Sequence, residues 1–268
     1  MYCSVFTGIR RKGQKAQRNL GLIGKFKYNR RMESIYTDGS YLQSNPGWHG
    51  QDAHWKLMHV LLALERAGAA DRVKTVCDVG CGAGELVKEW ARLRPDMRFT
   101  GCDISPQAHA LCLKDAPENA HFVHGGQVQG EHFDAILAVD VLEHVPDTDS
   151  FLSTLEAYAD LLVLHVPLDL SFRSVVKPEI LEEERRTVGH IHFYTAAYLK
   201  RLLAARGYEL LSWHYTNKYV ERPPELASAR SRLGMCIRRA AHYGMPRAWA
   251  AFLVGGYSVM LVARPRKS

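Results

Sequence analysis

The chain has 268 residues, a length that fits one full α/β domain with appendages. Its composition, 47% hydrophobic and 24% charged, is ordinary for a folded domain and argues against a disordered or fibrous protein. The six cysteines form no C-x-x-C pair and no zinc-like ladder with histidine, which excludes a disulfide framework or a zinc scaffold as the basis of the fold. We therefore expect a reducing, cytoplasmic setting.

The net charge of +7 is concentrated at the amino end of the chain. Residues 1–31 hold nine basic side chains and no acidic one, which leaves a charge of about −2 for the rest. We treat residues 1–40 as a basic N-terminal arm: a solvated arm, a contact for nucleic acid or anionic lipid, or an over-long start of translation. No apolar core follows the charges, so a secretory signal is not expected. The apolar run 248–263 is short and interrupted, so no transmembrane segment is predicted.

Strands and helices are expected to alternate from residue 74 onward. The run 74–79 is typical of a buried strand, 85–93 has helical spacing, and 98–102 is again strand-like. Ser105 and Pro106 favour a helix start, as N-cap and first helical residue. Further strands are expected at 121–124, 133–140, 161–167 and 208–215, and further helices at 57–64, 151–159 and 196–206.

A helical insertion, residues 217–256, separates the strand at 208–215 from a last strand at 257–265. Two helical stretches are expected within it, around 227–243 and 246–254. Two roles are open: a cap over the active site of a domain spanning 41–268, or a cover for one sheet edge. The whole pattern predicts an α/β, Rossmann-like, seven-stranded and mostly parallel sheet with helices on both faces.

Three glycines stand at alternate positions of segment 78–84, between a strand and a helix. Glycine is required where φ is positive or where a ligand lies directly against the backbone, and such crevices bind nucleotide-like ligands. The spacing is G-x-G-x-G instead of the dinucleotide pattern G-x-G-x-x-G, and Glu85 at the helix start would repel a diphosphate. The expected ligand therefore lacks phosphate. Asp103, which ends the second strand, is suited to accept hydrogen bonds from ribose hydroxyls; its alternative role is a helix-entry carboxylate beside Ser105.

Three motifs, in order, resemble those of class I S-adenosylmethionine-dependent methyltransferases. Residues 78–84 are similar to motif I of that family and residues 101–105 to its ribose-binding segment. Residues 133–147 are similar to its fourth-strand motif, in the form found in ubiquinone-biosynthesis-like and sugar-modifying members. Residues 45–56 resemble, more loosely, a block that precedes motif I in some bacterial methyltransferases.

The resemblance implies S-adenosylmethionine as cofactor and a role for each matching segment. The first motif would contact the methionine portion, the second the ribose and adenine, and the fourth-strand motif the reactive end. Members often carry an acid after the third strand for the adenine; here Gln127 or backbone would take that contact. The implied cofactor residues are Asp78, Gly80, Cys81, Gly82, Gly84, Asp103, Ile104, Gln127, Ala138 and Val139.

Methyl transfer from a sulfonium depends mainly on alignment and exclusion of water, and a hydroxyl acceptor gains further from a general base. Three histidines are candidates for that base: His144 after the fourth strand, and His190 and His192 in the loop after the fifth. Each could equally be a structural histidine bonded to a nearby carbonyl. Glu143 with His144 supplies only two metal ligands, so no metal site is predicted.

We therefore expect a methyltransferase acting on oxygen of a small molecule or saccharide. One alternative is an RNA methyltransferase that uses the basic arm; it is less favoured because no RNA-binding module is recognisable. A second is a non-catalytic, methyltransferase-like subunit with Trp249, Phe252 and Tyr257 at an interface. An NAD-linked oxidoreductase is a third. The identity of the acceptor and the oligomeric state do not follow from the sequence.

Overall fold

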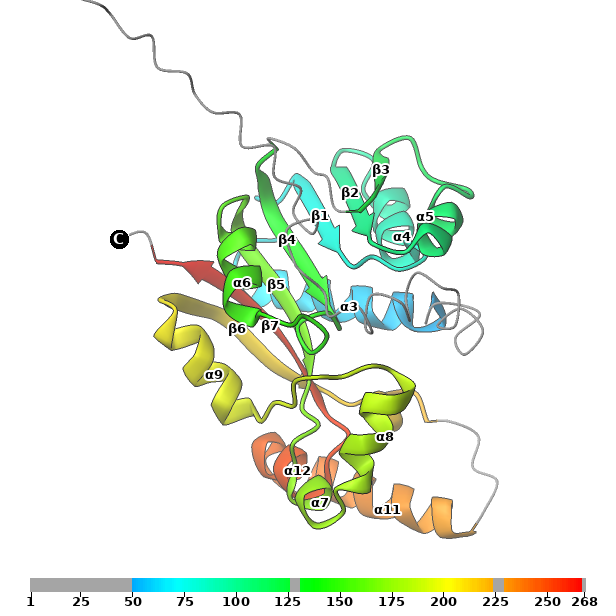
Figure 1. Ribbon diagram of the computed structural model, residues 1–268, viewed down its shortest axis with the longest axis vertical. Helices are drawn as coiled ribbons and strands as arrows, with labels where there is room; N and C mark the ends of the chain where they lie inside the picture. The colour runs from blue at the N-terminus through cyan, green and yellow to red at the C-terminus, as the bar shows by residue number, and fades with distance from the viewer. Residues whose placement is uncertain (1–49, 126–130, 224–228, 267–268) are drawn as a thin grey trace, which may run out of the picture.

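The computed structural model describes residues 50–125, 131–223 and 229–266. Its centre is a seven-stranded sheet with the strand order β3-β2-β1-β4-β5-β7-β6 (Figure 1). The strand β7 pairs antiparallel with both β5 and β6, whereas the pairs among β1 to β5 are parallel. The predicted Rossmann-like, mostly parallel sheet is therefore confirmed.

The strands are β1 (Thr75–Val79), β2 (Arg98–Asp103), β3 (Ala120–His124), β4 (Phe133–Val139), β5 (Ala159–Pro167), β6 (Tyr208–Thr216) and β7 (Ser258–Pro265). The helices are η1 (Gly50–Asp52, a 3₁₀ turn), α3 (Ala53–Arg66), α4 (Glu85–Leu93), α5 (Pro106–Cys112), α6 (Thr148–Glu156), α7 (Phe172–Val176), α8 (Glu179–Thr187), α9 (Ala196–Ala205), α10 (Lys218–Glu221), α11 (Ala229–Gly244) and α12 (Arg247–Val254).

The predicted boundaries differ from the observed ones mainly around α6. This helix begins at Thr148, because the Asp147 side chain accepts a hydrogen bond from the backbone N–H of Ser150 at 3.0 Å and caps it. It ends at Glu156, so Ala159, expected in the helix, opens β5 instead. The helices α7, α8 and α10 were not predicted. All three are short, and α8 has no buried residue, so no apolar period marks it in the sequence.

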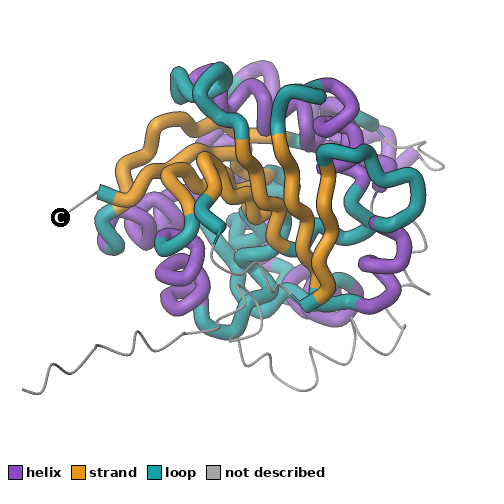
Figure 2. Tube along the Cα trace, turned by 90° about the horizontal axis from the view of Figure 1, so that it is seen from above, coloured by secondary structure: helices purple, strands orange, loops and turns teal. Residues whose placement is uncertain are grey.

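Helices cover both faces of the sheet (Figure 2). On one face, α3 and α4 contribute Leu57, Leu64 and Trp90 to a buried apolar cluster. On the other face, α6 and α9 contribute Phe151 and Leu199 to a second cluster, which also includes residues of α11 and α12. The central strand β4 is buried along nearly its whole length, as expected for a parallel strand covered on both faces.

The strand order reverses direction between β1 and β4, which are neighbours in the sheet. The chain leaves these two strands toward opposite sides, so a crevice forms at their carboxyl ends. The helices α11 and α12 of the insertion pack against each other, and α12 packs against α7, at one end of the molecule (Figure 1). The predicted arm at 1–40 lies outside the described residues. Within the described ranges, no helix is long and apolar enough to cross a membrane.

Candidate active site

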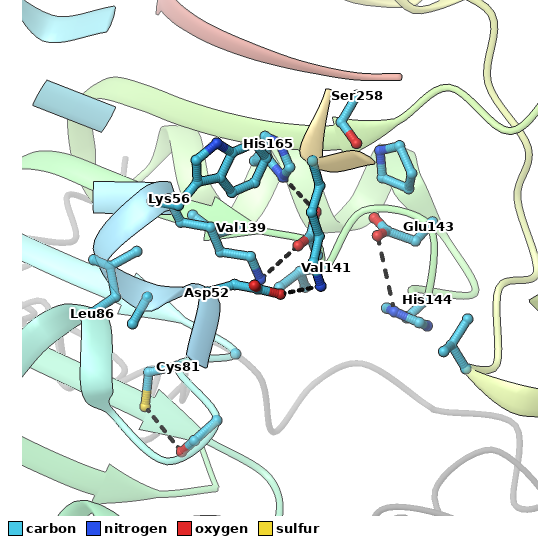
Figure 3. Close-up of a pocket in the computed structure, with 18 of the residues that line it drawn as sticks. Asp52, Lys56, Cys81, Leu86, Val139, Val141, Glu143, His144, His165 and Ser258 are labelled. Atoms are coloured by element: carbon cyan, nitrogen blue, oxygen red, sulfur yellow. Dashed lines mark hydrogen bonds and ion pairs between the residues drawn. The ribbon is translucent and has the colours of Figure 1, made fainter. Parts of the chain in front are cut away.

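A cavity of about 450 Å³ lies at the carboxyl ends of β1, β2 and β4. Its lining has two halves that come from different parts of the chain. One half is the glycine-rich turn after β1 together with the end of β2. The other combines α3, the loop after β4, the end of β5, the C-terminal part of α8 with the loop after it, and the ends of the insertion. Figure 3 shows part of this lining, including Lys56, Glu143 and His144. The volume is in the range of sites for small-molecule ligands, roughly 300–1,000 Å³.

The glycine-rich turn adopts the backbone that its glycines were predicted to permit. Gly80, Gly82 and Gly84 have φ angles of 75°, 56° and 76°. The backbone N–H groups of Gly80 and Cys81 both donate to the carbonyl of Cys102, which bends the turn over β2. A side chain at Gly80 would come within 2.6 Å of Val141, so this turn also needs glycine for packing.

Two of the predicted cofactor residues do not line the cavity. A Cβ at Gly84 would lie 2.6 Å from the ring of Phe122, so this glycine makes room for the core. Ala138 is fully buried within β4, while its neighbour Val139 does line the cavity. Gln127 lies outside the described residues. The other seven predicted cofactor residues line the cavity: Asp78, Gly80, Cys81, Gly82, Asp103, Ile104 and Val139.

Asp103 takes the helix-entry role and also lines the cavity, while its contact with a ribose stays a prediction. One carboxylate oxygen accepts a hydrogen bond from Gly82 N at 2.9 Å, and the other accepts one from Ser105 N at 2.8 Å. The side chain therefore anchors the glycine turn and the start of α5 while it lines the cavity. Burial raises the pKa of Asp103 to about 6, although the backbone N–H donors act in the opposite direction.

Asp78 is the second buried carboxyl group of this half. It is only 3% exposed, and its Oδ1 has no hydrogen-bond partner among the described residues. Burial raises its pKa to about 7; the positive charge of Lys56 opposes the shift, and the carboxylate of Asp103 adds to it. Two buried carboxyl groups with raised pKa values favour a cationic ligand and disfavour a phosphate, because a nearby positive charge would relieve the cost of ionising them.

A charged network that the sequence analysis missed crosses the middle of the cavity. Asp140 accepts from Lys56 Nζ at 2.7 Å and from His165 Nδ1 at 2.5 Å. Figure 3 labels Lys56 and His165 in the cavity wall. His165 Nε2 lies 2.9 Å from the hydroxyl of Thr216. These contacts hold the pKa of Asp140 well below its usual range, despite its burial. Asp140 has a φ of 57°, which aspartate tolerates better than most residues. Both oxygens of Asp140 are bonded, so the network fixes the end of β4 and is not a proton acceptor.

The predicted candidate histidines separate into two groups. His144 and His190 line the cavity, with ring centroids 4.9 Å apart. His192 does not; its Nε2 lies 2.9 Å from the carbonyl oxygen of Val145, which is the structural role that the sequence analysis left open. The loop that carries His190 and His192 is held by the Glu143 carbonyl, which accepts from the backbone N–H groups of Ile191 and His192.

Glu143 lies between the two histidines in the second half of the cavity, which we call the acceptor half. Its side chain is fully buried, and neither carboxyl oxygen has a hydrogen-bond partner among the described residues. Oε1 lies 3.9 Å from His190 Nε2 and 4.0 Å from His144 Nε2. Burial, with the negative charge of Asp140, raises the pKa of Glu143 to about 8. The group is therefore mainly protonated at neutral pH.

The two cavity histidines differ in protonation because their partners differ. His190 Nδ1 donates to a carboxylate oxygen of Asp169 at 2.7 Å. This bond and the negative charge of Asp169 raise the pKa of His190, although burial alone would lower it. His144 Nδ1 donates to the carbonyl of Gly189 at 3.1 Å, and burial together with the charge of His190 lowers its pKa to about 4. His190 with Asp169 is therefore the more basic of the two.

The same three side chains have the composition of a metal site. The ligand atoms of Glu143, His144 and His190 lie within 4.8 Å of one another. Each imidazole also donates its Nδ1–H to an oxygen, a second interaction that metal-ligating histidines almost always make. The sequence analysis counted only Glu143 and His144; His190 joins them from 46 positions later in the chain.

The sheet topology, the glycine turn and the acid at the end of β2 define an α/β protein that binds a nucleoside-containing ligand. A family model described as "Methyltransferase domain" matches residues 53–212. The chain therefore belongs to the methyltransferase-domain family. The match includes α3 and the glycine turn. It also includes Asp78 and Asp103, the buried acids of the half of the cavity that we call the cofactor half, and the cavity histidines His144 and His190.

Curated relatives match a shorter part of the chain. A ubiquinone biosynthesis O-methyltransferase of Methylobacterium sp. (strain 4-46) is 34% identical over 87 residues, which are 30% of this chain and 34% of that protein. The enzyme with the same name from Pseudomonas paraeruginosa is 31% identical over 119 residues, 39% of this chain and 50% of that protein. The aligned part thus spans from about a third to a half of these relatives.

Solved structures share the fold over most of the chain. The plantazolicin methyltransferase BpumL, in complex with S-adenosylhomocysteine, has a TM-score of 0.57 at 14% identity and covers 88% of this chain and 95% of its own. The mycolic acid cyclopropane synthase CmaA1 has a TM-score of 0.52 at 15% identity, over 76% and 82% of the two chains. At such identities the similarity establishes the fold alone.

Proposed function

We propose that this protein transfers a methyl group from S-adenosylmethionine to a hydroxyl oxygen of a small molecule or saccharide. The observation that carries the cofactor is the pair of buried carboxyl groups, Asp78 and Asp103, beside the glycine turn. The unpartnered Oδ1 of Asp78 suits the ammonium of a methionine portion, and Asp103 suits a ribose. Structural neighbours crystallised with S-adenosylhomocysteine support the same choice.

An oxygen acceptor is supported by two facts. The curated relatives that match this chain are named O-methyltransferases. The acceptor half of the cavity also holds His190, paired with Asp169, with its Nε2 3.9 Å from an unpartnered carboxyl oxygen of Glu143. A hydroxyl must lose its proton as its oxygen forms a bond to carbon, so a general base is useful here, whereas the lone pair of an amine needs none to attack.

S-adenosylmethionine, when bound, supplies a methyl group on a positively charged sulfur. His190 Nε2 accepts the hydroxyl proton of the acceptor, and the charge that forms on the imidazole is stabilised by Asp169. Glu143, protonated at neutral pH, donates a hydrogen bond toward the acceptor without adding a negative charge. The network of Lys56, Asp140 and His165 fixes the end of β4 between the two halves.

The proposal is tested first on the cofactor. In calorimetric titrations, S-adenosylhomocysteine should bind the full chain, while NAD should not. Asp103→Ala should weaken binding at least about tenfold, because each hydrogen bond to a charged group contributes roughly 1.5–3 kcal/mol. The control is Asp160→Ala, an exposed acid on β5 outside the cavity. Tight NAD binding without uptake of adenosylhomocysteine would overturn the assignment.

The acceptor class is tested separately, by transfer of a labelled methyl group to panels of phenols, saccharides, amines and RNA. Label on oxygen of a phenol or saccharide is expected; label on RNA would support the alternative that uses the basic arm. The measurement is repeated after dialysis against a chelator. Unchanged turnover is expected if Glu143, His144 and His190 act as proton donors and acceptors. A loss of turnover that a divalent cation restores would make them metal ligands instead.

A further inference from the structure

Three helices at one end of the molecule expose apolar side chains that no described segment covers. These helices, α7, α11 and α12, hold nine of the fourteen large apolar side chains that are exposed among the described residues. In Figure 1 they gather on the side of the sheet away from β1, β2 and β3. The nine side chains are Phe172, Val175, Val176, Leu233, Ile237, Tyr243, Trp249, Phe252 and Leu253.

On two of these helices the exposed apolar residues follow a helical period. On α12, Trp249, Phe252 and Leu253 occupy positions i, i+3 and i+4, so they share one face of the helix, and the face of Ala250 and Ala251 is buried. On α7, Phe172, Val175 and Val176 repeat this spacing. Each helix therefore has an apolar face toward solvent in addition to the residues that it buries.

The charge on these three helices has one sign. The described helices α7, α9, α11 and α12 contain no aspartate or glutamate. Basic residues on or beside the three helices include Arg173, Lys177, Arg232, Arg239 and Arg247, while Arg238 of α11 donates to the carbonyl of Gly255. Acids border the surface on two neighbouring helices, on α8 from Glu179 onward and on α10 at Glu221, and α10 contacts α11.

We propose that α7, α11 and α12 form a docking surface for an anionic lipid membrane. Aromatic and aliphatic side chains on one face of short helices, with only basic charges around them, are the chemistry of helices that lie in the interface of a bilayer. Anionic headgroups attract each nearby lysine or arginine, and the apolar side chains enter the headgroup and acyl boundary. A protein partner of acidic character would satisfy the charges equally well, but it would not require nine large apolar side chains to face outward together.

A second cavity adjoins the same surface. It has a volume of about 430 Å³ and lies between α12, the start of α9 and the segment before α7. Trp249 and Phe252 form part of its wall, and Lys200 is its basic residue. An apolar groove next to a cation matches the shape of a lipid, whose acyl chain and anionic headgroup are covalently joined. The groove therefore supports a bilayer as the partner and does not belong to the cofactor site.

The test is flotation of the full chain with vesicles of phosphatidylcholine alone or with added phosphatidylserine. Binding to the anionic vesicles, weakened by salt, is expected. The double variant Val176→Ser with Lys177→Glu should lower the partition coefficient at least about tenfold, since each basic residue near the membrane contributes about 1 kcal/mol. The matched control is Leu113→Ser with Lys114→Glu, an equally exposed apolar–basic pair that also follows a short helix but lies next to α5. The basic arm is present in every variant, so its contribution cancels.

Trp249 supplies a second readout that does not depend on the arm. Lipids brominated on the acyl chain should quench Trp249 fluorescence on binding, and Trp249→Phe should remove this quenching while the protein still binds. Calorimetry with S-adenosylhomocysteine checks that each variant is folded. Equal loss of binding in the Leu113/Lys114 control, or no preference for phosphatidylserine, would overturn the proposal. A lipid-free dimer that Trp249→Ser dissociates would assign the surface to a second copy of the chain instead.

Discussion

The two halves of the main cavity are built in different ways. The cofactor half comes from one strand, one five-residue turn and the end of the neighbouring strand, so most of its residues lie close together in the sequence as well as in space. The acceptor half combines residues from α3, the β4–α6 loop, the end of β5, the C-terminal part of α8 with the loop after it, α10 and β7. The cofactor half depends on the backbone conformation of one short turn, so the same turn can bind the same cofactor in proteins that act on different acceptors. The acceptor half depends on segments that vary in length, and it is the part that can change the acceptor.

The largest expected effect tests the chemistry of the acceptor half. His190→Ala should lower turnover by about 10²–10⁴-fold at saturating cofactor, since it removes the base, and should leave the affinity for S-adenosylhomocysteine nearly unchanged. His192→Ala is the control, because it alters the same loop but lies outside the cavity. If His190→Ala loses less than tenfold, or if both variants lose equally, His190 is not the base.

The sequence predicted the cofactor half of the cavity better than the acceptor half. Strand and helix positions, the sheet and the cofactor turn were predictable because alternating apolar runs and the glycine spacing are local signals. Lys56 and His165 were not, because each is an unremarkable residue in its own segment and gains its role only when α3 and β5 place both against Asp140. A signal for His190 was present as one histidine among thirteen, but the sequence could not separate it from His192.

The next prediction concerns stability and probes the cofactor half. Gly84→Ala should lower the free energy of unfolding by about 2–4 kcal/mol, because a Cβ would strain the positive φ and press on Phe122. Gly207→Ala is the matched control, with a φ of 78° but no atom within 4 Å of the added carbon, and should cost only about 1 kcal/mol. Urea unfolding compares the two. Equal losses would mean that Gly84 is needed for its φ alone and not for packing.

An effect that is smaller at any single step of one pH unit concerns the buried acid Glu143. The pKa of Glu143 is about 8 in the folded protein, above its ordinary 4.5, so the folded state holds a proton that the unfolded state releases between these values. Stability from this group is therefore complete below about pH 4.5 and is lost as the pH rises toward 8, with a slope of at most about 1.4 kcal/mol per pH unit. Glu143→Gln should remove this slope between about pH 5 and 8.

The control for that pH series is Glu209→Gln. Glu209 is exposed and paired with Arg264, and its pKa is lowered, so it finishes titrating below the range of the experiment. Chemical unfolding at each pH gives the difference between wild type and variant. A constant difference for Glu143→Gln across the range would contradict the raised pKa, and with it the role of Glu143 as a neutral donor.

The smallest predicted effect concerns the contacts that hold the insertion against the acceptor half. Asp52 of η1 is buried and accepts from both Lys218 and Arg222, which begin and follow α10. The Lys218 side chain is half-exposed, so Lys218→Ala should change the apparent cofactor affinity less than about threefold, as expected for exposed ion pairs. Asp52→Ala removes the shared acceptor of both cations and should cost more, because the bond from Arg222 to the backbone carbonyl of Gln51 is then what remains between η1 and the end of α10. If calorimetry gives equal losses for the two variants, Lys218 alone carries the contact, and the acceptor half is closed by a single ion pair instead of a shared acid.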